Sequence, residues 1–75
     1  MRTVAFLLLP GVHLMDLAGP AQVFYEAGQL GRFPVRIHYV GMKSEVTTAQ
    51  HLPVIPTTSH TELELGPDDF LCIPG

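Results

Sequence analysis

The chain has 75 residues, of which 47% are hydrophobic and 15% charged, and its formal net charge is −3. A chain of this length forms one domain at most, and a domain of this size buries only about 60% of the surface that its unfolded chain exposes. The mildly acidic balance argues against nucleic-acid binding by these residues, and a single cysteine excludes an internal disulfide.

The first residues carry no targeting signal. The apolar core of "MRTVAFLLLPG" is too short for a secretory signal peptide, and no small-residue cleavage site follows it. No stretch approaches the roughly 18 apolar residues of a membrane span. We therefore expect a cytoplasmic chain that has no membrane partner.

An uninterrupted apolar run, "TVAFLLL", occupies residues 3–9. Continuous rather than alternating hydrophobicity is typical of a strand that is covered on both faces, as in a parallel sheet. Pro10 and Gly11 end this strand, and residues 12–15 are expected to form a connecting loop.

A helix is expected from about Leu17. Apolar residues recur there at helical spacing: Val23, Phe24, Ala27 and Leu30. Pro20 suits the first turn, where its missing N–H would have no partner within the helix. Gly28 and Gly31 stand near the expected end of the helix.

The segment "FPVRIHYVG", residues 33–41, alternates and predicts a second strand with one better-covered face. Val35, Ile37 and Tyr39 would share that face, and Tyr39 is expected to lie in the core. The opposite face would carry Arg36, His38 and Val40. Arg32 and Arg36 are expected to be ordinary surface charges.

The next stretch, residues 45–59, is rich in Thr, Val and Pro. Pro53 and Pro56 cannot donate in a central ladder, so we expect short strands or an irregular hairpin at an edge of the sheet. Residues 60–69 are polar and contain a turn signal at Gly66. The apolar run "FLCI" at residues 70–73 predicts a last short strand.

The order of strand, helix, strand, edge piece and strand is the opening of an open α/β sheet. One helix cannot cover both faces of such a sheet, and the last predicted strand has no helix after it. The sequence therefore predicts an α/β fold with a mostly parallel sheet, of which residues 1–75 form an N-terminal fragment.

Asp16 is the first candidate for chemistry. It lies just past the first strand and just before the helix, where ligands bind in open parallel sheets and where a helix N-terminus favours negative charge. One interpretation is a helix-entry carboxylate that only satisfies backbone donors. The other is a carboxyl in a partly apolar pocket that shares a proton with a nucleophile or a ligand. Spacing alone leaves both open.

Three further residues are weighed as site residues. Gly75, after Pro74 at the same edge of the sheet, would leave backbone N–H groups facing a ligand, as in an oxyanion hole. His13 lies in the loop that carries Asp16. Cys72 lies inside an apolar run and is expected to be an inert small core residue rather than a nucleophile.

No metal or cofactor is expected. The four histidines lack the spacing of metal ligands: His13, His38, His51 and His60. The glycines of "GQLG" follow the helix instead of preceding it, which is the wrong context for a dinucleotide-binding loop.

With these residues in place, the chain resembles the N-terminal part of the ThiJ/PfpI superfamily, the class-I glutamine-amidotransferase-like group with a flavodoxin-like three-layer sandwich. The motifs that carry the resemblance are "LMDLAGPAQVFYEA", the alternating strand, the Thr/Pro-rich edge and "DDFLCIPG". The resemblance covers essentially all 75 residues but less than half of a complete domain of that family. The "DLAGPAQVF" segment is similar to isonitrile hydratases and to the ligand-sensing domains of GlxA-type AraC-family regulators.

The resemblance implies roles for particular residues. Asp16 matches the acidic residue that hydrogen-bonds the reactive cysteine of the family, and Gly75 matches a glycine whose backbone helps line the oxyanion site. The family's nucleophilic cysteine sits on a strand-to-helix elbow further along the chain, beyond residue 75, so Cys72 does not match it. His13 is added as a third ligand-binding candidate because it neighbours Asp16.

The function favoured by the resemblance is a small-molecule-sensing domain of an AraC-type transcriptional regulator, in which DNA would be bound only by a domain outside these residues. The alternative is a cysteine-dependent hydrolase or isonitrile hydratase-like enzyme whose nucleophile lies beyond residue 75. A third hypothesis is a structural half-domain. The expected partners are a small-molecule ligand, the remainder of the domain or a second chain, and a second copy in a homodimer.

Overall fold

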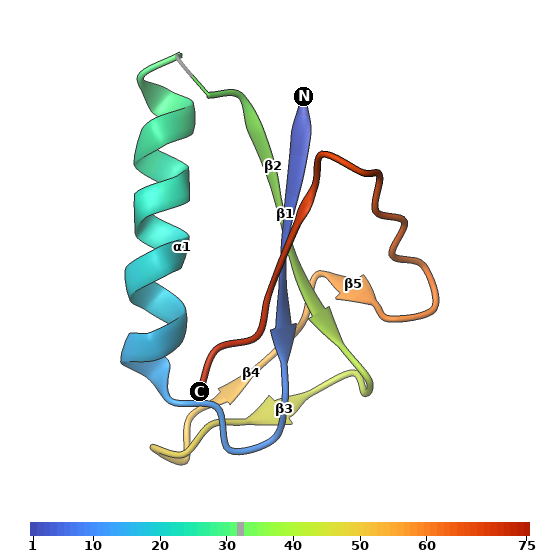
Figure 1. Cartoon of the computed structure of the whole chain (residues 1–75). Coiled ribbons are helices and arrows are strands. Elements are labelled where there is room, and N and C mark those ends of the chain that lie inside the picture. The colour runs from blue at the N-terminus through green and yellow to red at the C-terminus, as the bar shows by residue number, and fades with distance from the viewer. Residues whose placement is uncertain (32) are drawn as a thin grey trace.

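The computed structural model describes residues 1–31 and 33–75; Arg32, expected as a surface charge, lies outside the described residues. Four parallel strands form the main sheet in the order β5–β2–β1–β6 (Figure 1). They are β1 (Arg2–Leu8), β2 (Val35–Gly41), β5 (Thr58–Ser59) and β6 (Phe70–Cys72). The expected α/β fold with a mostly parallel sheet is confirmed.

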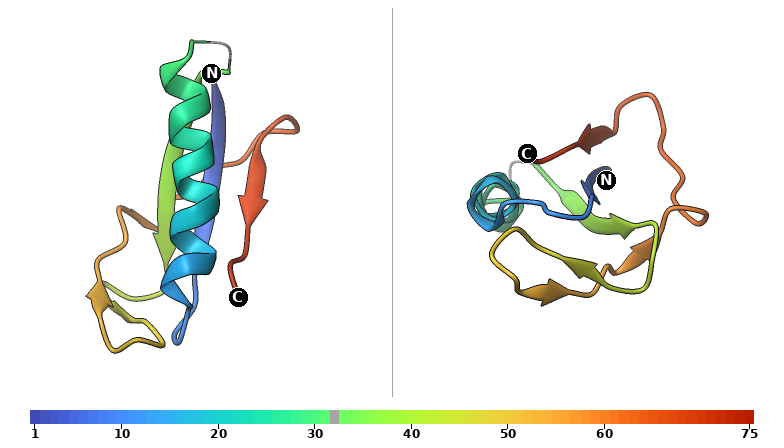
Figure 2. Two further views of the ribbon diagram at one scale, coloured as in Figure 1. Left: turned by 90° about the vertical axis from the view of Figure 1, so that its left-hand side faces the viewer. Right: turned by 90° about the horizontal axis from the view of Figure 1, so that it is seen from below.

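Segments of the described chain lie on both faces of the sheet, but a helix packs on only one of them. Helix α1 (Leu14–Gln29) connects β1 to β2 and lies along one face. Strands β5 and β6 stand at opposite edges of the sheet, so residues 60–69 must cross it, and they do so on the side away from α1 (Figures 1 and 2). The result is a three-layer arrangement with a helix on one face and irregular chain on the other.

Strand β1 forms the centre of the core. Val4, Ala5 and Phe6 are fully buried, which confirms the prediction of a strand covered on both faces. The Phe6 ring contacts Phe24 of α1 edge-on at 6.2 Å between centroids and stacks on Tyr39 of β2 at 5.8 Å. Aromatic pairs in these two geometries contribute about 0.5–1.5 kcal/mol each beyond their buried area. Tyr39 therefore packs against the core, as predicted.

The prediction of one better-covered face on β2 is wrong at its C-terminal end. Val35, Ile37 and Tyr39 pack toward the core but are only half-buried, whereas Val40 on the opposite face is 1% exposed. Residues 60–69 cross the sheet on that side, which the alternation of β2 could not reveal. Arg36 is exposed, as expected.

Helix α1 begins three residues earlier than predicted. The sequence suggested a loop at residues 12–15 and a helix from about Leu17, but the first helical residue is Leu14. Pro20 is therefore the seventh residue of α1 and not part of its first turn, as we had expected. The helix ends as predicted: Leu30 is its C-cap, and Gly31 adopts a φ of 73°, the left-handed conformation that glycine tolerates best.

The Thr/Pro-rich stretch forms short strands, as expected, but only one of them, β5, lies at the edge of the main sheet. Strands β3 (Val46–Thr47) and β4 (Pro53–Val54) form a short antiparallel hairpin outside the main sheet. Strand β5 then pairs with the end of β2 at the edge of the main sheet. In place of a helix, this hairpin connects β2 to β5.

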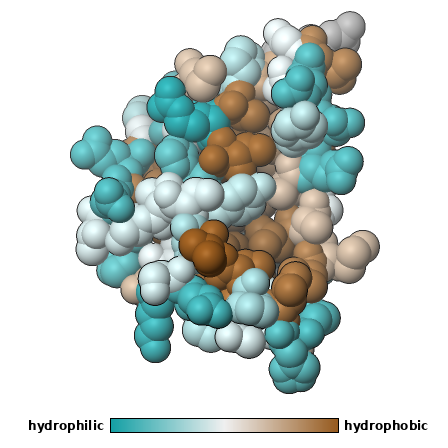
Figure 3. Space-filling model, turned by 180° about the vertical axis from the view of Figure 1, so that it is seen from behind, coloured by the Kyte–Doolittle hydropathy of each residue, from teal (hydrophilic) through white to brown (hydrophobic). Residues whose placement is uncertain are grey.

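Apolar side chains remain on the surface in several parts of the described chain, β6 among them. Phe70 and Leu71 of β6 are 42% and 50% exposed, and Ile73, which follows this strand, is 60% exposed. The face seen from behind in Figure 3 carries hydrophobic side chains along its middle. A hollow of about 330 Å³ between α1 and the β3–β4 hairpin is lined almost wholly by apolar residues, among them Leu17, Tyr39 and Val54.

Candidate functional site

The carboxyl ends of β1 and β6 meet beside the start of α1, and this meeting point is called the Asp16 corner below. It consists of His13 and Asp16 on one side and Gly75 on the other. From β1 the chain passes to β2 on one flank, and β6 is later added on the opposite flank. Ligands of open α/β sheets bind at such a point, outside the carboxyl ends of the strands where the strand order reverses.

Asp16 is the third residue of α1, so it lies inside the first turn and not just before the helix, as the sequence had suggested. Its Oδ2 would be 3.4 Å from a Cβ built on Gly75, which places the carboxylate against the backbone of that glycine. The side chain is otherwise exposed. Within residues 1–31 and 33–75 the carboxylate has no hydrogen-bonded donor, so the interpretation of a carboxylate that satisfies backbone donors finds no such bond there.

His13 joins the two sides of the corner through its backbone. Its N–H donates to the carbonyl oxygen of Gly75 at 2.8 Å. His13 is the N-cap residue of α1 in extended conformation, and its side chain is exposed and makes no capping hydrogen bond. The chain after β6 is thereby fixed to the start of α1, as Figure 1 shows at the C-terminal label.

Gly75 presents one backbone donor to the corner. Pro74 has no N–H, so of the two residues only Gly75 can donate, and in the described part of the chain its N–H has no acceptor. The carboxylate of Asp16 and the backbone of Gly75 thus lie next to each other at the ends of the parallel strands. Such a pair can bind a group that both accepts and donates hydrogen bonds.

Gln50 is a residue of this region that the sequence did not reveal. Its side-chain Oε1 accepts a hydrogen bond of 3.0 Å from the N–H of Leu14, the first residue of α1. The two residues are 36 positions apart, and Gln50 lies in the turn between β3 and β4. No local pattern signals a helix cap supplied from so far away.

Two hollows of the described chain lie away from the Asp16 corner. One of about 430 Å³ lies at the C-terminal ends of β2 and β5 and is lined by residues such as Lys43, Thr57 and Glu62. Another of about the same volume lies between α1 and β2, beside Ala18, Tyr25 and Ile37. Geometry at the strand ends, and not cavity volume, therefore identifies the corner as the candidate site.

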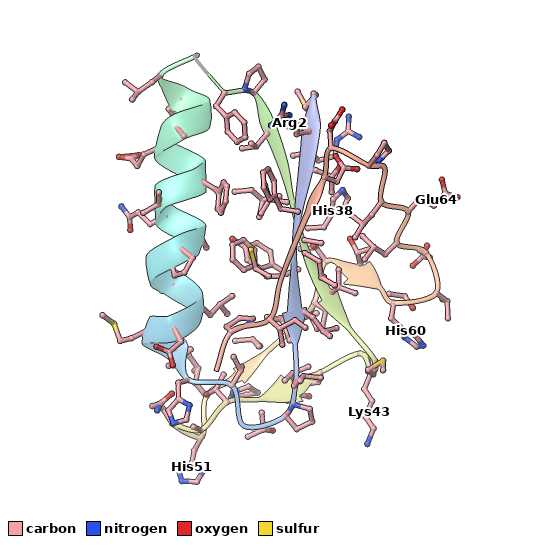
Figure 4. All side chains as sticks on the ribbon, in the orientation of Figure 1. Arg2, His38, Lys43, His51, His60 and Glu64 are labelled. Carbon is pink, nitrogen blue, oxygen red and sulfur yellow. The ribbon has the colours of Figure 1, made fainter. Side chains whose placement is uncertain are left out.

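Metal chemistry finds no support in the described residues. No group of three or more His, Cys, Asp or Glu side chains lies close enough there to hold a metal ion. Figure 4 shows that His38, His51 and His60 come from different parts of the fold and do not point toward one another. The Nδ1 of His38 instead lies 2.7 Å from the hydroxyl of Thr58. No helix in the same residues is long and apolar enough to cross a membrane.

Cys72 is a free, half-buried cysteine on β6 that packs against the core on the α1 side of the sheet. It is paired in register with Phe6 of the central strand. This position agrees with the expected structural role of the thiol.

Comparison with solved structures identifies the fold. The whole chain matches an AraC family transcriptional regulator from Pseudomonas putida with a TM-score of 0.76 and 16% sequence identity, over 47% of that chain. A DJ-1 superfamily protein from Salmonella typhimurium, solved as a cysteine-to-alanine mutant, matches 79% of this chain and 30% of its own, with a TM-score of 0.50 and 20% identity. No family model and no curated protein matches the sequence.

At these identities the likeness establishes the fold, and the chain spans about half the length of the first of these structures. The chain thus has the fold of an AraC-family regulator and of a DJ-1 superfamily protein, which is the fold that the ThiJ/PfpI resemblance implies.

Proposed function

We propose that these residues are the N-terminal part of a small-molecule-sensing, ThiJ/PfpI-like domain of an AraC-type transcriptional regulator. The match of the entire chain to such a regulator supports this proposal. DNA would be bound by another domain, since the net charge of −3 offers no electrostatic attraction to phosphate. The protein would act in the cytoplasm as a homodimer.

The observation that carries the proposal is the position of Asp16 beside Gly75 at the carboxyl ends of β1 and β6. A side chain whose only purpose was to start a helix would have no reason to lie against the end of another strand. The first turn of a helix is also a favourable position for a carboxylate side chain.

The chemistry of the corner indicates the class of ligand. Asp16 can accept two or more hydrogen bonds, and no cationic side chain neutralises it within the described residues. The N–H of Gly75 offers a donor beside it. A complementary ligand therefore carries an amino, amide or hydroxyl donor next to a carbonyl or similar acceptor, and the exposed His13 would be a further contact.

The test is a thermal-shift screen of the whole protein against small metabolites that carry amino, amide and hydroxyl groups, followed by Asp16→Ala and Asp16→Asn. We expect a ligand that stabilises the natural protein and alters its DNA binding, and at least a tenfold weaker affinity in both variants. Glu26→Ala, which removes an exposed carboxylate from the same helix, serves as the matched control. Unchanged ligand affinity together with a large loss of stability in Asp16→Ala would restore the purely structural interpretation of this residue.

The enzymatic alternative requires a nucleophilic thiol. Cys72 is poorly suited, because it is half-buried and packs against the core as a small hydrophobic residue. A hydrolase or isonitrile hydratase would therefore need a cysteine beyond residue 75. No specific feature of the described residues favours that alternative over the sensing domain.

A further inference from the structure

We propose that Gln50 is a positioning residue for the Asp16 corner, and that the β3–β4 hairpin is the element that holds this corner in shape. The proposal rests on the proposed function, because it assigns Gln50 to the same ligand site. It goes further in naming a residue that is distant in sequence and that forms no hydrogen bond with Asp16 or Gly75 within the described residues.

The start of α1 lacks a local cap. His13 stands at the N-cap position but contributes no side-chain hydrogen bond, although the first N–H groups of a helix need acceptors from outside the helix. The side-chain oxygen of Gln50 accepts from the N–H of Leu14 at 3.0 Å. The helix that carries Asp16 is therefore capped by the hairpin.

The hairpin is also tied to the loop that precedes α1. The N–H of Gly11 donates to the carbonyl of Thr47 at 2.9 Å, and the N–H of Ala49 donates to the carbonyl of Val12 at 3.0 Å. Val12 itself is buried. Three hydrogen bonds therefore connect residues 47–50 to residues 11–14, so that the hairpin turn and the start of α1 move as one unit.

The turn that presents Gln50 is closed tightly. The backbone N–H of Thr48 donates to the carbonyl of Leu52, and the N–H of Leu52 donates to the Thr48 hydroxyl, both at 3.1 Å. Thr48 is 2% exposed. His51, next to Gln50, adopts a φ of 66°, a left-handed conformation that costs energy for any residue other than glycine. A strained turn that is anchored by the buried Thr48 fixes the direction in which the exposed Gln50 points.

The consequence reaches Asp16 through the first turn of the helix. Asp16 follows Leu14 by two residues, so loss of the cap would let this turn fray and move the carboxylate away from Gly75. The bond from the His13 N–H to the Gly75 carbonyl holds the other side of the corner. Gln50 thus sets the distance between the carboxylate and the donor that a ligand would bridge.

The experiment compares the whole protein with Gln50→Ala and Gln50→Glu, with Gln22→Ala on the exposed side of α1 as the matched control. We measure amide hydrogen exchange of residues 12–17 and the ¹³C resonances of the aspartate carboxyl groups. In Gln50→Ala the Leu14 amide should exchange about fivefold faster, which corresponds to the loss of one hydrogen bond. The Asp16 carboxyl resonance should move while that of Asp69 stays in place.

Gln50→Glu keeps an acceptor oxygen at the same reach and should restore both signals. The proposal is overturned if Leu14 exchange is unchanged in Gln50→Ala, if the Asp69 resonance moves as much as that of Asp16, or if glutamate fails to rescue. The proposed function can fail separately. If Gln50→Ala has the expected effect but Asp16→Asn leaves ligand affinity unchanged, Gln50 positions a corner that binds no ligand.

Discussion

Asp69 is a single side chain that joins two distant parts of the chain. Its carboxylate accepts hydrogen bonds from the backbone N–H of Thr3 at 2.8 Å and of Gly66 at 2.7 Å. These bonds hold the pKa of Asp69 below its ordinary value of 3.8, because both donors favour the ionised form. The hydrogen bond from Thr3 is the largest cause and that from Gly66 is the next. Asp69 thereby closes the turn before β6 and attaches it to the start of β1.

This lowered pKa predicts how stability depends on pH. Because the folded-state pKa of Asp69 lies below the unfolded one, its stabilising effect is complete above pH 3.8 and is lost as the pH falls through the folded-state value. Asp69→Asn removes the charge and one acceptor, so the variant should be less stable near neutral pH, with the difference shrinking in acid. Urea midpoints of the two proteins from about pH 7 to about pH 3 measure this. A difference that is constant over that range would contradict the prediction.

Gly41 is required by close packing and not by backbone conformation. A Cβ at this position would collide with the ring of Pro56 and lie 3.0 Å from the carbonyl oxygen of Lys43. We expect Gly41→Ala to destabilise the protein by about 1–3 kcal/mol, the usual cost of overpacking. Gly66→Ala is the control, since its Cβ would meet Asp69 at an ordinary 3.5 Å. Equal melting temperatures of the two variants would show that the β2–Pro56 contact yields freely.

At the scale of elements, the strands were predictable and the start of the helix was not. The ends of β1, β2 and β6 fall within two residues of the predicted ranges, because apolar runs bounded by Pro and Gly carry their own signals. The start of α1 depends on Gln50, which lies in another element. The covering of Val40 likewise depends on where residues 60–69 cross the sheet. Tertiary contacts of this kind leave no local pattern.

Pro20 lies in the interior of α1, where it cannot donate to the carbonyl of Asp16. Gly19 before it has no Cβ to clash with the proline ring, which lets the helix continue through the pair. Pro20→Ala restores the missing bond and should raise stability by about 1–2 kcal/mol, less than the full helix penalty of proline because the alanine also gives the unfolded chain more freedom.

The melting temperature of the whole protein measures this effect of Pro20→Ala, and ligand affinity is measured beside it. If Gly19 and Pro20 shape the Asp16 corner, the variant should gain stability and lose affinity, the usual trade at binding sites. A fall in melting temperature would contradict the account of Pro20 as a tolerated helix defect.

At the scale of the whole molecule, the topology explains why the sequence could identify the two ends of the candidate site but not its surroundings. Asp16 and Gly75 each follow a predicted parallel strand, and parallel strands end at the same edge of a sheet. Their proximity follows from that rule. The exposure of Asp16 does not, because burial depends on what else covers the corner, and the described residues cover only part of it.

The surface of the chain predicts how it behaves alone. Its accessible area is 5086 Å², whereas a compact monomer of 8.2 kDa exposes roughly 4,500 Å². The excess accompanies exposed apolar side chains on β6, which has no strand on its outer side among the described residues. Unpaired strand edges with apolar side chains favour association with other chains.

We therefore expect the isolated 75 residues to self-associate or to melt over a broad, weakly cooperative range. Sedimentation velocity and thermal circular dichroism measure the two properties. Leu71→Lys on β6 should reduce the association without making the melting sharper, because a charge on an edge strand blocks edge-to-edge pairing but supplies no missing core. A sharp two-state transition of a monomer would mean that the apolar surface of β6 is tolerated in water, and that the core around Phe6 is sufficient by itself to hold the Asp16 corner together.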